Sequence, residues 1–133
     1  MDTEAERTKV WKGKESLNLK IATYNIWNSE SGMPYRIKYI VNEIKLINAD
    51  VICLQEVSSG KLAESIAANA DYPYWYFHNY PDNEEGLCIM AKMPFLDCET
   101  WIGEANAIYC SFFYNSHKIA VVNVHLPWDS VLS

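Results

Sequence analysis

The sequence predicts an α/β fold in which a mostly antiparallel sheet carries two helices on one face. Three observations support this prediction. The 133 residues are the length of one domain, and half of them are hydrophobic. An amphipathic helical pattern is followed by a strand that is apolar on both faces, as in a βαβ unit. The rest of the chain consists of strand-like segments separated by short turns, which favours antiparallel neighbours.

The first elements follow a charged segment, residues 1–16, which has no periodicity and is expected to be a flexible lead-in. Residues 19–27 are β-branched and aromatic and predict a strand. Pro34 then stands where the first turn of a helix tolerates proline. The helix that follows is predicted from apolar residues at helical spacing: Ile37, Ile40, Val41, Ile44 and Ile47.

The remaining elements are a second, weaker helix over 61–70 and a series of strands. The strands are predicted over 51–57, 74–78, 87–92, 95–101, 107–114 and 118–126. Those at 51–57 and 119–126 are apolar on both faces. Because two helices cover only one face of a sheet, we expect the other face to be uncovered within this chain. The isolated chain should then self-associate through that face or be marginally folded.

Composition and charge exclude several classes of protein. Only 21% of the residues are charged, which excludes a disordered chain or a coiled coil. The net charge of −6 argues against a basic surface that binds nucleic acid directly. A bound divalent cation could still connect the protein to a phosphate substrate. The sequence has no transmembrane segment and no apolar signal core, so a cytoplasmic location is expected unless the chain is an excised piece of a secreted protein.

Polar residues stand at the ends of apolar strands, where side chains often carry function. Asn25 could bind local backbone or a ligand. Glu56 could pair with Arg36 or bind a hard cation such as Mg²⁺. Glu85 lies in an acidic turn before Gly86, which allows close backbone approach or a bulge.

His125 ends the last apolar strand. It is either a satisfied core residue or a group for proton transfer near neutral pH. The sequence alone leaves both interpretations open.

The order of these segments is similar to the first half of the endonuclease/exonuclease/phosphatase superfamily, the metal-dependent phosphoesterases related to DNase I. The resemblance covers residues 17–128 or so. It rests on Asn25 after a strand and an amphipathic helix, then on Asp-Val-Ile-Cys-Leu-Gln-Glu-Val, Glu-Gly-Leu-Cys-Ile-Met and Val-Val-Asn-Val-His-Leu. It implies that residues 17–133 form the N-terminal portion of such a domain, half of a four-layer αββα sandwich.

The resemblance also implies roles for the polar residues. Glu56 would be the ligand of Mg²⁺ or Mn²⁺, and Asn25 would help to bind the metal and the phosphate. His125 would act on the phosphate as an acid or charge stabiliser, with Glu85 orienting it. Arg36 would be structural. The implied reaction is in-line attack of water on a phosphoester, with the metal as Lewis acid.

One departure from the family pattern is large. Its Gly-Asp-x-Asn and Ser-Asp-His motifs do not occur in these 133 residues. We therefore expect phosphoester hydrolysis in a parent protein and a catalytically incomplete chain here. The sequence does not distinguish between nucleic acid, a phospholipid headgroup and a small phosphate ester as the substrate. The alternative is a non-enzymatic, truncated module that associates through its uncovered sheet face.

Overall fold

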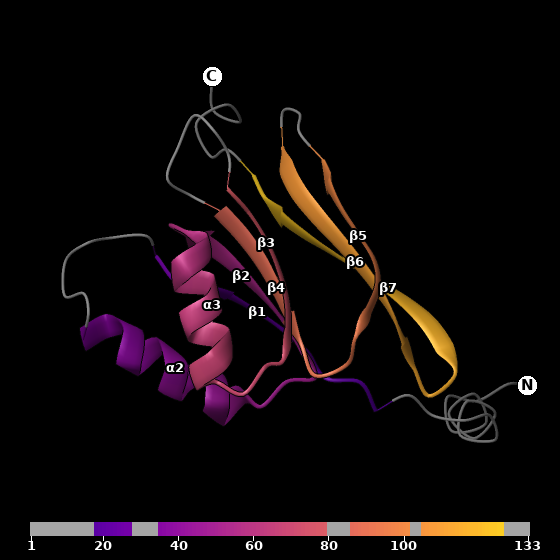
Figure 1. Cartoon of the computed structure of the whole chain (residues 1–133), viewed down its shortest axis with the longest axis horizontal. Helices are drawn as coiled ribbons and strands as arrows, with labels where there is room; N and C mark the ends of the chain where they lie inside the picture. The colour runs from indigo at the N-terminus through magenta and orange to yellow at the C-terminus, as the bar shows by residue number, and fades with distance from the viewer. Residues whose placement is uncertain (1–17, 28–34, 80–85, 102–104, 127–133) are drawn as a thin grey trace, which may run out of the picture.

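The computed structural model describes residues 18–27, 35–79, 86–101 and 105–126. It confirms the predicted α/β class, with a layer of helices and mostly antiparallel strands (Figure 1). The predicted lead-in, residues 1–16, lies outside the described residues. The elements in chain order are β1 (Ile21–Asn25), α2 (Tyr35–Ile47), β2 (Val51–Val57), α3 (Gly60–Asn69), β3 (Tyr74–Asn79), β4 (Gly86–Ala91), β5 (Phe95–Trp101), β6 (Asn106–Tyr114) and β7 (His117–His125).

The first sheet has four strands in the order β1-β2-β4-β3. Strands β1 and β2 are parallel, because helix α2 carries the chain back to the start of the sheet between them. The pairs β2/β4 and β3/β4 are antiparallel. In the parallel pair Asn25 lies opposite Gln55, so the carboxyl ends of β1 and β2 meet at one edge of the sheet.

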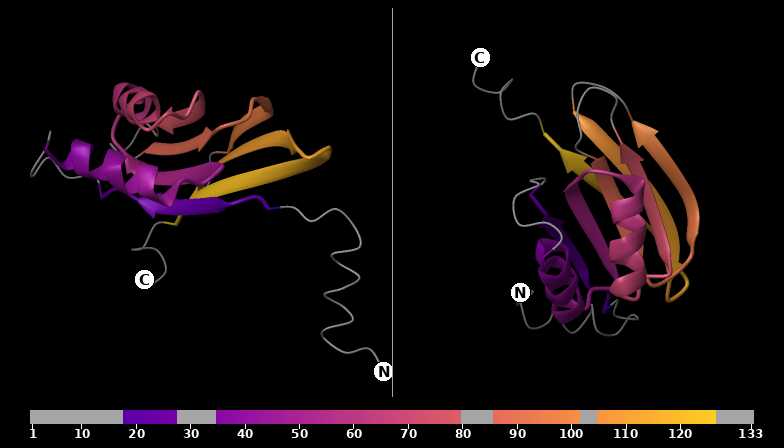
Figure 2. Two further views of the ribbon diagram at one scale, coloured as in Figure 1. Left: turned by 90° about the horizontal axis from the view of Figure 1, so that it is seen from below. Right: turned by 60° about the vertical axis from the view of Figure 1, so that its left-hand side comes forward.

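Helices α2 and α3 cover one face of this sheet (Figure 2). The apolar side of α2 buries Ile40, Val41 and Ile44, as the helical spacing predicts. Helix α3 begins after Ser59, whose side chain accepts a hydrogen bond from the Leu62 amide at 3.1 Å. No helix among the described residues is long and apolar enough to cross a membrane.

A second sheet, in the order β5-β6-β7, covers the opposite face of the first. The core between the two sheets is buried and apolar, and it consists of Val51, Cys53, Leu87, Ile89, Ala91, Ile108, Cys110, Phe112 and Val121. The expectation that this face would be uncovered within the chain is therefore wrong. The strands expected to extend one sheet form a separate sheet that packs on it, so β2 is buried on both faces by its own chain.

Strand β7 is buried on one face only, although its sequence is apolar on both. Val121 and Asn123 point into the core between the sheets, whereas Val122 and Val124 point outward and are 45% and 43% exposed. Among the described residues no helix covers this outer face (Figure 2). In the part of the chain that the structure describes, the uncovered sheet face is thus the outer face of the second sheet.

Candidate functional site

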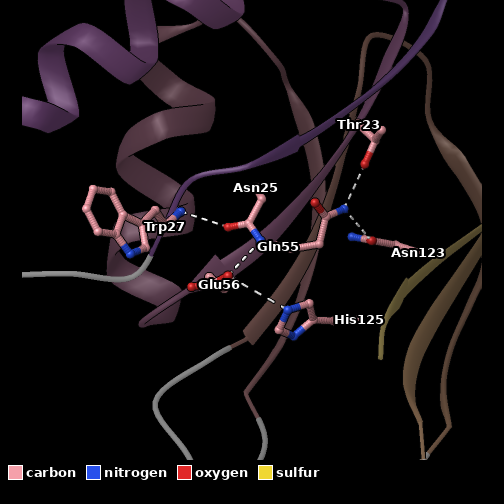
Figure 3. Close-up of polar contacts among 7 residues, drawn as sticks. All are labelled: Thr23, Asn25, Trp27, Gln55, Glu56, Asn123 and His125. Carbon is pink, nitrogen blue, oxygen red and sulfur yellow. Dashed lines mark hydrogen bonds and ion pairs between the residues drawn. The ribbon is translucent and has the colours of Figure 1, made fainter. Parts of the chain in front are cut away.

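Three of the four predicted site residues come together where β1, β2 and β7 end (Figure 3). Asn25 Nδ2 donates a hydrogen bond of 2.6 Å to Glu56 Oε2. His125 Nε2 lies 3.8 Å from the same oxygen. One carboxylate oxygen of Glu56 therefore joins a strand of the first sheet to a strand of the second.

The backbone at Glu56 has an uncommon conformation. Its φ of 61° lies in the left-handed region, which costs a residue other than glycine on the order of 1 kcal/mol. The pairing of β2 with β4 shifts register between Gln55 and Val57, so Glu56 is the extra residue of a β-bulge. A bulge turns a side chain out of the strand's regular alternation. Here it keeps the Glu56 side chain 16% exposed inside a strand that is otherwise buried.

Gly86, on the neighbouring strand β4, leaves room for the backbone of this bulge. It pairs with Val57, and a Cβ at Gly86 would lie 2.8 Å from the Val57 carbonyl oxygen and closer still to the Phe77 ring. The close backbone approach predicted for this glycine is therefore confirmed.

Asn25 makes the local backbone contact that was one of its two predicted alternatives, and it also contacts Glu56; binding of a ligand by Asn25 stays a prediction. Its Oδ1 accepts a hydrogen bond from the Trp27 amide at 2.8 Å, which closes a local turn after β1, while its Nδ2 binds Glu56. Arg36, at the start of α2, donates to the carbonyls of Ile26 and Trp27 and lies 5.3 Å from the Trp27 ring centre. The segment that follows β1 is thus fixed to helix α2.

A buried amide pair lies beneath the site. Gln55 Nε2 donates to Thr23 Oγ1 and to Asn123 Oδ1, both at 2.9 Å (Figure 3). Asn123 Nδ2 donates in turn to the carbonyls of Leu54 and Cys88, both at 2.9 Å. Neither amide was predicted as a site residue, although each is a polar residue inside an apolar strand. The pair fixes β7 to the first sheet two residues before His125.

The fourth predicted residue, Glu85, lies outside the described residues. Its predicted role in orienting His125 therefore stays a prediction. His125 itself is 30% exposed and faces Glu56.

The donors at this edge suit a hard divalent cation that keeps most of its water. Magnesium takes one or two carboxylates and retains several waters. Glu56 offers one partly exposed carboxylate, and the Asn25 amide holds that carboxylate in place. Within the described ranges no group of three or more His, Cys, Asp or Glu residues gathers, so a zinc-like cage is not formed there.

The sequence matches the profile of the Endonuclease/Exonuclease/phosphatase family over residues 22–129. This range includes every element described above except the first residue of β1, Ile21, and it includes each of the four predicted site residues. No curated protein matches the sequence significantly.

Solved structures share the fold at low sequence identity. A humanised TDP2 from D. rerio superposes with a TM-score of 0.67 at 19% identity, over 81% of this chain and 47% of that one. ANGEL2, described as a 2',3'-cyclic phosphatase, gives 0.68 at 18%, over 84% and 42%. Sphingomyelinase C from Streptomyces griseocarneus gives 0.62 at 21%, over 84% and 49%. The chain spans about half the length of these proteins.

Proposed function

Since the chain belongs to the Endonuclease/Exonuclease/phosphatase family, we propose that it is the N-terminal portion of a divalent-metal-dependent phosphoester hydrolase and carries the metal-binding glutamate. The observation that supports this most is the Glu56 carboxylate, which stands at a strained bulge between Asn25 and His125. Strained backbone that the surrounding structure maintains is concentrated at functional sites.

In this proposal Glu56 binds Mg²⁺ or Mn²⁺ directly. Asn25 orients the carboxylate through its N–H donor, and its amide oxygen keeps a second lone pair for a ligand. His125 lies near the same Glu56 oxygen that Asn25 contacts. It is placed to donate a proton or a hydrogen bond to a phosphate oxygen. A bound cation would supply Lewis-acid stabilisation of the phosphoryl group.

The substrate is proposed only as a phosphoester. The structural relatives differ in what their names state: one TDP2 structure holds a single-stranded DNA product, ANGEL2 is a cyclic phosphatase, and the third is a sphingomyelinase. Their common element is a phosphate ester. We propose that these 133 residues alone are catalytically incomplete, because the Gly-Asp-x-Asn and Ser-Asp-His motifs do not occur in the sequence.

Metal binding tests this function directly, without requiring turnover. Titration calorimetry with MgCl₂ or MnCl₂ should give a weak binding heat with the wild-type chain, because one carboxylate leaves the ion mostly hydrated. Glu56→Gln should abolish that heat, since the amide has no charge. Glu64→Gln, at an exposed position of α3, is the matched control and should bind as the wild type does. Equal heats for wild type and Glu56→Gln would remove Glu56 from the site.

A second candidate function, association with another copy of the chain, is favoured by the outer face of the second sheet. Its apolar side chains follow the strand register: Tyr109 lies opposite Val122, and Trp101 stacks on Tyr109 with ring centres 6.1 Å apart. Trp101, Phe113, Val122 and Val124 are each between 43% and 56% exposed. These side chains leave on the order of 400 Å² of apolar surface in water.

Two chains that pack these faces together about a two-fold axis would form only a weak dimer. A stable interface buries roughly 800 Å² on each partner, about twice what this patch offers. We therefore expect sedimentation velocity to show monomer at low micromolar concentration and dimer at several hundred micromolar. Val122→Lys should keep the chain monomeric, whereas Ala68→Lys, on the exposed side of α3, should not. A compact monomer at every concentration would reject self-association.

A further inference from the structure

We propose that Cys98 and Cys110 are a site of disulfide formation, at which a low-molecular-weight disulfide oxidises the pair to an intramolecular cross-strand bond. The family match does not assign this site, and the inference does not depend on the proposed hydrolase function.

The two sulfur atoms lie close together on neighbouring strands. Cys98 on β5 and Cys110 on β6 are direct partners in the antiparallel register. Directly opposed residues in such a ladder have Cα atoms about 4.5 or 5.5 Å apart, and both values lie within the range of disulfides. The Sγ atoms are 3.1 Å apart, so they already point at each other and need approach by only about 1 Å to bond.

The other two cysteines make an internal comparison. Cys53 and Cys88 lie on the adjacent strands β2 and β4 of the first sheet. However, Cys53 faces the core between the sheets, whereas Cys88 faces the helices. Side chains on opposite faces of a sheet cannot bond to each other, so the structure offers this pair no disulfide.

The exposure of the two sulfurs sets the order of the reaction. Cys98 is partly exposed on the edge strand β5, whereas Cys110 is fully buried. The Cys98 thiolate would attack oxidised glutathione, giving a mixed disulfide and releasing one glutathione thiolate. The Cys110 thiolate would then attack the Cys98 sulfur, forming the cross-strand bond and releasing the second glutathione. The two cysteine thiols lose two electrons and two protons, and one glutathione disulfide becomes two thiols.

Burial also makes the reaction slow near neutral pH. It raises the pKa of the Cys98 thiol and that of the Cys110 thiol, and the reactive species is the thiolate. The rate should therefore rise about tenfold per pH unit between pH 7 and 9, as the thiolate fraction rises.

The test incubates the folded full chain with oxidised glutathione at pH 8.5, followed by acid quenching, alkylation in denaturant and digestion without reductant. Mass spectrometry should then find one linked peptide pair, Cys98 with Cys110, that disappears after reduction. Cys53 and Cys88 should be alkylated. The oxidised chain should melt at least about 4 °C higher, because the bond constrains the unfolded chain. Cys98→Ser and Cys110→Ser should each lose the linked pair, whereas Cys88→Ala should retain it.

Three results would overturn the proposal. One is recovery of both Cys98 and Cys110 in the alkylated form after incubation with the oxidant. Another is a lasting glutathione adduct on Cys98 with Cys110 still a thiol, because a sulfur in contact would have displaced it. The third is a link that forms only in urea or that joins Cys110 to Cys53, which would show that the folded register does not direct the bond.

Discussion

Gln55 and Asn123 are hydrogen-bonded to each other across the two sheets, at 2.9 Å, with almost no exposure to water. Each also binds elsewhere, so that the pair connects Thr23, the Leu54 carbonyl and the Cys88 carbonyl. Gln55 precedes Glu56, and Asn123 lies two residues before His125 on the same face of β7. The contact between two buried amides thus sets the separation of the two residues proposed to act on a phosphoester.

Replacing Asn123 by leucine should destabilise the chain strongly. Leucine has the same branched arrangement of side-chain heavy atoms as asparagine but leaves the Gln55 amide and two buried carbonyls without this partner. Each unsatisfied buried group costs about 1–3 kcal/mol, so we expect a loss of about 3 kcal/mol or more in the free energy of unfolding, measured by urea denaturation. Asn69→Leu, at an exposed position near the end of α3, is the control and should cost less than about 1 kcal/mol. Equal losses in the two variants would contradict the role of the network.

Glu56→Gly should separate folding from metal binding. Glycine adopts a φ of 61° without steric cost, so the free energy of unfolding should be unchanged or higher by up to about 1 kcal/mol. The same variant should bind no Mg²⁺ in calorimetry, because the carboxylate is gone. Glu56→Val should instead lose about 1–2 kcal/mol, since a β-branched residue tolerates the left-handed conformation poorly. Equal stability of the glycine and valine variants would argue against a left-handed backbone conformation at Glu56.

Hydrolysis by these 133 residues should stay at background. We expect no Mg²⁺-dependent release of nitrophenol from an activated phosphodiester, because no aspartate of a Gly-Asp-x-Asn motif is present to activate water. His125→Ala serves as the matched variant. Robust turnover by the wild-type chain that disappears in His125→Ala would refute the proposed incompleteness and at the same time support the proposed site.

Stability should fall in alkaline solution as the unfolded chain's cysteines ionise. Burial raises the pKa of Cys53 from 9.0 to about 11. Its thiol therefore stabilises the fold fully below pH 9, and this contribution is lost as pH rises from 9 through 11. For Cys53 alone the loss is about 2 kcal/mol, measurable by urea unfolding at pH 8 and pH 11. Cys53→Ala should show a pH dependence smaller by that amount. An unchanged pH dependence would mean that Cys53 is not buried as a neutral thiol.

Most of the helices and strands, and the residues that break their patterns, were predictable from the sequence alone. Strands 51–57 and 95–101 have the predicted bounds, and helix α2 begins directly after Pro34. These features follow from the spacing of apolar residues, which recurs every two residues in a strand and about every 3.6 in a helix. This spacing can be recognised within one short segment of sequence. Glu56 was recognisable for the same reason, since a carboxylate soon after the apolar run 51–54 breaks the pattern of a buried strand.

The division of these strands between two sheets depends on packing between distant segments and was not predictable from the sequence. Val121 and Val122 are equally apolar, yet one is buried and the other is nearly half exposed, because sheet stacking gives β7 one covered face. The left-handed turn at Glu56, the amide pair of Gln55 and Asn123, and the contact of Cys98 with Cys110 likewise depend on register. Register arises from pairing between distant segments, and a local hydrophobic pattern does not specify which segments pair or which apolar face remains in water.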